Sequence, residues 1–77
     1  MYKVYEVPSK RNYAGYSFVA ANSAEEANRM IEAFKESDSS NFYDSYGYGS
    51  VEEEDVIESL HADHDGFIFH GIFYYPV

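Results

Sequence analysis

The chain has 77 residues, no cysteine, and 14 acidic against five basic residues, which gives a formal net charge of −9 at pH 7. A chain of this length forms one domain (residues 1–77) with a small core, and the absence of cysteine excludes disulfides and thiolate metal sites and favours a cytoplasmic location. The charge argues against nucleic-acid phosphates and anionic membranes as direct ligands, and no apolar run is long enough to span a bilayer.

Two strands are predicted at the start of the chain. Residues Tyr2–Val7 alternate between two faces and are rich in aromatic and β-branched side chains, which is the pattern of a strand. Residues 8–12 contain Pro8 and two basic residues and indicate a turn. Residues Tyr13–Ala21 alternate again, and the short separation predicts that the two strands form a hairpin.

A helix is predicted over Ser23–Glu36. Ser23 is placed to accept a backbone N–H as the N-cap, and Glu26 is placed three residues later to close a capping box. Apolar side chains then recur at the spacing of one buried helical stripe, at Ala27, Met30, Ile31 and Phe34. Lys35 lies in the last turn, where a cation interacts favourably with the helix dipole.

The segment 51–60 allows two interpretations. Ser50–Glu53 resembles a second capping box, which would begin an acidic helix over Val51–Leu60. Alternatively, Val56–Leu60 is a strand, and His61–Gly66 turns it back into the last strand. The Asp-Gly pair directly before an apolar run is a strong hairpin signal, so we favour the hairpin.

The last strand is predicted over Phe67–Val77, and both of its faces are mostly apolar. One face can pack on the helix, and the other must be covered by the 42–60 segment, by a partner, or by a second copy in a homodimer. We therefore predict an α+β fold: a small antiparallel sheet of three to four strands with the 23–36 helix on one face. The predicted order of elements is β-β-α-β-β or β-β-α-α-β.

Charge is distributed unevenly along the chain. All five basic residues lie at or before Lys35, and ten acidic residues follow it. Acidic runs of this kind form either a solvated face or a surface that steers a basic partner. The candidate partner-binding carboxylates are Glu52, Glu53, Glu54, Asp55 and Glu58.

A segment rich in tyrosine, serine and glycine over 41–49 has the composition of an antibody paratope. Tyrosine offers a large amphipathic contact with few torsions to immobilise, although the same side chains are also common in cores. The candidate binding residues in this loop are Tyr43, Asp44, Tyr46 and Tyr48.

Imidazole and carboxylate groups gather near the predicted turn, at His61, Asp63 and His64. These are the ligand types of zinc and nickel, but their spacing matches no specific zinc pattern. The more common explanation of such a group is a polar turn in which the aspartates accept local backbone N–H groups. No nucleophile motif or phosphate-binding glycine loop is present, so we expect no catalytic activity and no cofactor.

The sequence therefore predicts a small acidic, non-catalytic protein-interaction module that binds another protein, basic in character, or itself. Its Tyr-rich loop and its carboxylate-rich surface are the predicted contacts. The alternative is a nucleic-acid mimic, in which carboxylates occupy the phosphate sites of a host nuclease or other DNA- or RNA-binding protein. Small acidic, aromatic-rich inhibitors encoded by phages are similar in type. Divalent metal binding at His61 and His64 is the third hypothesis.

Overall fold

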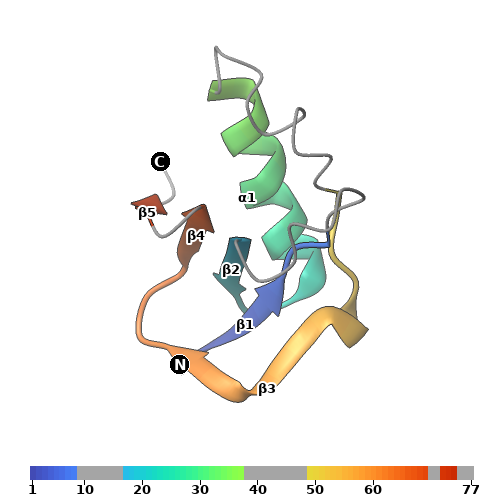
Figure 1. The fold of residues 1–77 in the computed structure, drawn as a ribbon, viewed down its shortest axis with the longest axis vertical. Coiled ribbons are helices and arrows are strands. Elements are labelled where there is room, and N and C mark those ends of the chain that lie inside the picture. Colours follow the sequence, from blue (N-terminus) through green and yellow to red (C-terminus); the bar gives the residue numbers. More distant parts are fainter. Residues whose placement is uncertain (9–16, 38–48, 70–71, 75–77) are drawn as a thin grey trace.

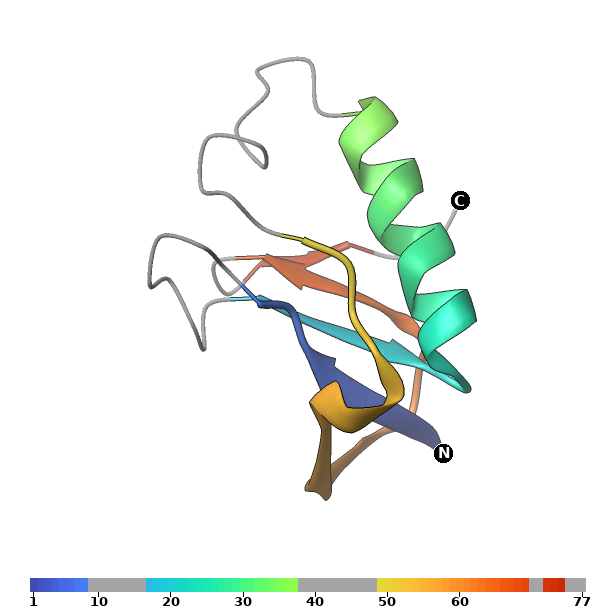
Figure 2. The ribbon, with the colours of Figure 1, turned by 90° about the vertical axis from the view of Figure 1, so that its right-hand side faces the viewer.

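The structure, a computed structural model, describes residues 1–8, 17–37, 49–69 and 72–74. Within these residues, five antiparallel strands form one sheet in the spatial order β3-β1-β2-β4-β5, and helix α1 packs on one of its faces (Figure 1; Figure 2). This arrangement confirms the predicted α+β class. The elements are β1 (Tyr2–Glu6), β2 (Ser17–Ala21), α1 (Ala24–Ser37), the short 3-10 helix η1 (Glu53–Asp55), β3 (Val56–Ala62), β4 (Gly66–Phe69) and β5 (Ile72–Tyr74).

Helix α1 begins as predicted. The Ser23 hydroxyl accepts the Glu26 N–H at 3.2 Å, so Ser23 is the N-cap. The Glu26 carboxylate accepts the Asn22 N–H at 3.1 Å, one residue earlier than in a standard capping box. Both contacts satisfy backbone N–H groups at the entry to the helix, which fixes where the chain leaves β2 and turns onto the sheet.

The core lies between α1 and the face of the sheet that it covers. Ala27 and Ile31 are buried, and Met30 and Phe34 pack against the same cluster, which confirms the predicted helical stripe. The Phe34 ring lies 4.8 Å from that of Phe67 on β4, centroid to centroid. The sheet and the segment before η1 contribute Tyr5, Val7, Val19, Ala21, Phe67 and Val51.

The predicted pairing of β1 with β2 is confirmed. The two strands are antiparallel, with Tyr5 opposite Val19, and the Val7 N–H donates to the Ser17 carbonyl at 3.0 Å beyond the end of β1. β3 is added to the outer edge of β1 and β4 to the outer edge of β2, and β5 then pairs with β4. Tyr5 and Val19 are fully buried beneath the helix.

The chain over 56–62 is a strand, as favoured, but the predicted hairpin between it and the next strand is wrong. Strand β3 pairs with β1, and β4 pairs with β2, so two strands separate them. Asp65-Gly66 is not a hairpin turn: Gly66 is the first residue of β4 and has a positive φ of 157°, which glycine adopts without strain.

Contacts with α1 explain this topology. The Asn28 side chain forms two hydrogen bonds with Val51, donating to its carbonyl at 2.9 Å and accepting its N–H at 2.8 Å. This clamp holds the segment before η1 against the helix and directs β3 to the free edge of β1. The place beside β2 is then available to β4, which buries Phe67 under the helix, whereas an edge position would expose it.

The predicted single strand over Phe67–Val77 is two strands. β4 and β5 pair with each other, with Phe69 opposite Ile72, so the chain reverses direction between them. This reversal accounts for the fifth strand of the sheet. The side chain of Phe67 is in the core against Phe34 of α1, in agreement with the prediction that one face of this segment packs on the helix.

Several predicted features lie outside the described residues. They are most of the predicted turn and the start of the second predicted strand (residues 9–16), residues 41–48 of the tyrosine-rich segment, and residues 70–71 and 75–77 of the last predicted strand. Within the described part of the chain, no helix is both long enough and apolar enough to cross a membrane.

Candidate protein-binding site

Strand β3 is irregular where it passes β1. Lys3 pairs with His61 and Tyr5 pairs with Val56, so the single residue between Lys3 and Tyr5 faces the four residues 57–60 of β3. The extra residues form a bulge that carries this part of β3 away from its neighbour. Bulges of this kind commonly occur at the edges of sheets and re-aim side chains near functional sites.

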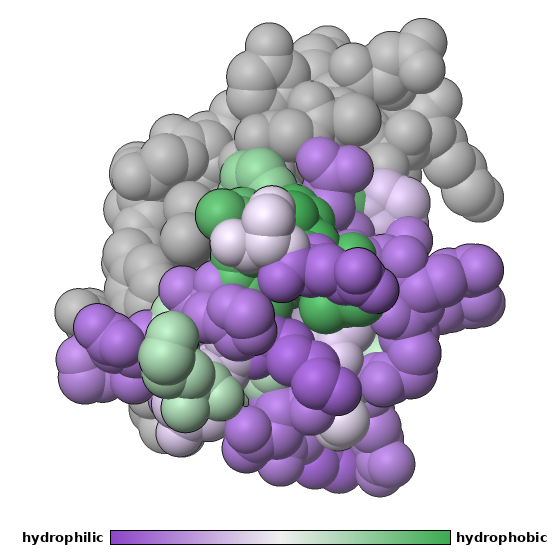
Figure 3. Space-filling model, turned by 90° about the horizontal axis from the view of Figure 1, so that it is seen from below, coloured by the Kyte–Doolittle hydropathy of each residue, from purple (hydrophilic) through white to green (hydrophobic). Residues whose placement is uncertain are grey.

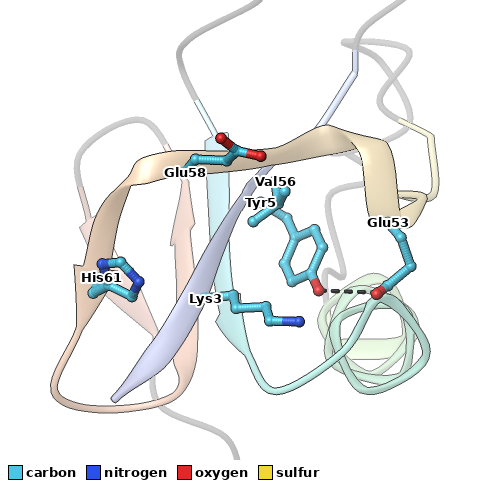
Figure 4. A pocket seen from close by; sticks show the side chains of 6 residues that line it. All are labelled: Lys3, Tyr5, Glu53, Val56, Glu58 and His61. Atoms are coloured by element: carbon cyan, nitrogen blue, oxygen red, sulfur yellow. Dashed lines mark hydrogen bonds between the residues drawn. The ribbon is translucent and has the colours of Figure 1, made fainter.

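The bulge leaves a pocket of about 280 Å³ between β1 and β3 (Figure 4). His61 lies at one end of the pocket and Glu53, which comes from η1, lies at the other. The Tyr5 ring lies between the two strands, and its hydroxyl points toward Glu53. The lining residues are Lys3, Tyr5, Glu53, Val56, Glu58 and His61.

Glu53 joins three elements through one carboxylate oxygen. Its Oε1 accepts a hydrogen bond from the Tyr5 hydroxyl at 3.0 Å and another from the backbone N–H of Ala24, the first residue of α1. A carboxylate is stabilised at a helix N-terminus because the N–H groups there are unpaired and the helix dipole is positive. Glu53 therefore ties η1 to both β1 and α1 and closes one end of the pocket.

These contacts shift the pKa values of both side chains. The hydrogen bond from the Ala24 N–H, followed by that from Tyr5, lowers the pKa of Glu53, and the charge of Lys3 lowers it further. Burial raises the pKa of Tyr5 from 10.0 to about 12, and the hydrogen bond to Glu53 adds to this effect. At neutral pH the pair is a protonated phenol donating to an ionised carboxylate.

The Tyr5–Glu53 pair should make stability depend on pH at both extremes. Because the pKa of Glu53 is lower in the folded state, its contribution is present at neutral pH and is lost as the pH falls through the folded-state pKa. Because the pKa of Tyr5 is raised, its contribution is present below pH 10 and is lost as the pH rises toward 12. In urea unfolding at pH 7, the free energy of unfolding of the Tyr5→Phe variant should be about 1 kcal/mol below that of the parent. Above pH 10 the parent should lose further stability, and the variant, which has no phenol at this position, should lose less.

Two glutamine variants provide the acid-side test. Glu53→Gln should remove part of the loss of stability in acid, whereas Glu54→Gln neutralises the neighbouring exposed carboxylate of η1 and should keep the parent's acid response. Equal responses of the two variants would show that the contacts of Glu53 do not carry the effect.

Of the remaining predicted carboxylates, only Glu58 is among the residues that line this pocket. Glu52, Glu54 and Glu58 are exposed, and Glu58 lies on the bulged part of β3. The Asp55 side chain accepts the Glu52 N–H at 2.7 Å, which closes η1 locally at Glu52 and not at Ser50. Seen from the end of the molecule where β3 lies, hydrophilic side chains surround a smaller apolar area (Figure 3). The structure thus brings the carboxylates of 52–58 together on η1 and β3.

The three predicted metal ligands are not assembled into a metal site. His61 and Asp63 are exposed, and His61 lies opposite Lys3 in the ladder and faces the pocket. Within the described residues, no group of three or more histidine, aspartate or glutamate side chains is arranged to hold a metal ion. The four loop residues Tyr43, Asp44, Tyr46 and Tyr48 lie outside the described part of the chain.

Sequence reasoning did not identify Lys3, Tyr5 and Val56 as lining residues. Their positions depend on β3 joining the β1 edge and on the length of its bulge, and neither is encoded in a local pattern. The sequence offers one signal of the bulge: more residues lie between η1 and the polar turn than a regular pairing with β1 can use.

Comparisons with known proteins identify no relative of this chain. No protein-family model matches this chain, and the searches of curated proteins and of solved structures found no similar protein. The functional interpretation therefore depends on the geometry and charge of the described residues.

Proposed function

We propose that the protein is a non-catalytic interaction module that binds a basic partner protein through the carboxylate-rich surface of η1 and β3. The observation that carries this proposal is the exposure of Glu52, Glu54 and Glu58 on adjoining elements of a chain segment without lysine or arginine. A surface of this kind accelerates the encounter with a basic partner and selects against acidic ones.

The basic residues of α1 have acidic neighbours on the same helix. Arg29 forms a salt bridge with Glu25 at 3.1 Å, and Lys35 lies 3.7 Å from Glu32. The charge of Lys3 acts on Glu53, at the edge of the acidic surface. These pairings support a division of the described surface into a helix of mixed charge and an acidic η1–β3 side.

Affinity capture from the source cells, run at about 50 mM and about 500 mM salt, tests the proposal because the screening length falls more than threefold over this range. We expect a partner that is retained at low salt and released at high salt. The double variant Glu52→Gln/Glu54→Gln should reduce the retention of this partner by about tenfold, at about threefold for each exposed charge.

The charge-matched control is Glu32→Gln/Glu36→Gln, which removes two exposed carboxylates from the second half of α1. It should retain the partner, because these charges are far along the helix from the end that contacts Glu53. Equal losses in the two double variants, or capture that is indifferent to salt, would contradict binding through η1 and β3. A partner that is itself a nucleic-acid-binding protein and is displaced by DNA or RNA would make mimicry the function of the same surface.

A further inference from the structure

We infer that the pocket beneath the β3 bulge is an anchor site for one cationic side chain, arginine or lysine, of the partner. This inference rests on the proposed function and names the place on the acidic surface where one side chain of the partner would bind. The volume of about 280 Å³ lies just below the usual range for drug-sized ligands, which suits a single side chain better than a larger molecule.

The charges that line the pocket favour a cation. Glu53 uses one oxygen for two internal hydrogen bonds, and its remaining charge is offset by the attraction of Lys3. The Tyr5 hydroxyl donates its proton to Glu53 and so can offer a ligand its oxygen only as an acceptor. Glu58 is the other carboxylate among the lining residues, and it is exposed. With His61 counted as neutral, the charges of Lys3, Glu53 and Glu58 therefore sum to the charge of one carboxylate.

The bulge also makes this part of the pocket wall accessible. Residues 57–60 of β3 have no partners on β1 in the register of the ladder, and residues 58–60 are exposed. A side chain that enters from this edge passes the bulged part of β3, which carries Glu58. A guanidinium group, with its several N–H donors in one plane, can contact the carboxylate and neighbouring carbonyl oxygens together.

Nuclear magnetic resonance titration with Nα-acetyl-arginine amide tests this inference directly. At low salt, the amide signals of residues 57–61 should shift saturably with the arginine compound. They should not shift with Nα-acetyl-citrulline amide, which has nearly the same shape but no charge. This experiment measures binding to the pocket alone, because the partner protein is absent.

Three variants separate the pocket from the general acidic field. Glu58→Gln should weaken the binding of the arginine compound by about threefold or more, whereas Glu54→Gln, an equal change of net charge outside the pocket, should change it by less than about twofold. Lys3→Met should strengthen binding, because it removes a like charge from the lining. The spectrum of each variant without ligand verifies that the fold is retained.

The inference is overturned by any of three results: no saturable shifts at residues 57–61, equal shifts with the citrulline compound, or equal weakening by Glu58→Gln and Glu54→Gln. Weaker binding of the arginine compound to Lys3→Met would also overturn it, because removal of a like charge from the lining of a cation site should strengthen that binding. None of these results would affect salt-dependent capture of a partner, so the proposed function would stand or fall separately.

Discussion

Replacing Ile31 with alanine should lower the free energy of unfolding by about 3 kcal/mol, the largest effect that we expect from a single substitution in this protein. Ile31 is 1 % exposed and belongs to the buried cluster between α1 and the sheet. The loss combines the transfer of its methyl and methylene groups with the cavity that they leave. A domain of this size has only a few kcal/mol of stability, so the variant should melt about 15 °C below the parent.

Graded controls distinguish this loss from a general effect of mutating the helix. Ile31→Val removes one methylene group and should cost about 1 kcal/mol. Glu32→Ala changes the adjacent exposed residue and should change stability by less than about 0.5 kcal/mol. A small effect of Ile31→Ala in thermal or urea unfolding would contradict the placement of this stripe against the sheet.

The second largest effect should come from Asn28, although it is a polar residue on the helix. Asn28→Ala removes both hydrogen bonds to Val51, whose side chain and backbone lie against the core with 2 % exposure. The Val51 N–H and carbonyl then lose their partners, and we expect a loss of about 2 kcal/mol in urea unfolding. Hydrogen exchange of the Val51 amide should accelerate by a larger factor than that of the helix amides.

Arg29→Ala is the matched control, because Arg29 neighbours Asn28 but makes an exposed salt bridge to Glu25. Its cost should be less than about 0.5 kcal/mol. If Asn28→Ala were as mild as Arg29→Ala, the segment before η1 would be held by something other than this clamp, and the explanation of the strand order would be wrong.

The clamp also connects the fold to the candidate site. Asn28 holds Val51, and two residues later Glu53 reaches Tyr5 on β1 and the N–H of Ala24. These contacts position η1 at one end of the pocket and start β3 along the β1 edge. A variant that releases the clamp should therefore disturb the amide signals of the pocket as well as lower stability.

The local elements could be predicted from the sequence because their signals are local. Ser23 and the stripe through Ile31 gave the helix, since capping and a 3.6-residue period depend only on near neighbours. Alternation gave β1 and most of β2, and the favoured strand over 56–60 is part of β3. The carboxylate-rich surface was also visible, because exposure of a charged run is the general expectation.

Beyond the predicted pairing of β1 with β2, only the tertiary structure decided which strands are neighbours. Asp65-Gly66 favours a hairpin by its local conformation, but the side chains of Asn28 and Glu53 fix the preceding segment to α1, 23 and 29 residues away from their partners in sequence. The burial of Phe67 then stabilises β4 beside β2. The same long-range contacts produce the bulge and the pocket that it leaves. Composition and periodicity thus determined the elements and the charge of this protein, whereas packing determined the strand order and the site, because contacts between distant residues leave no trace in a local pattern.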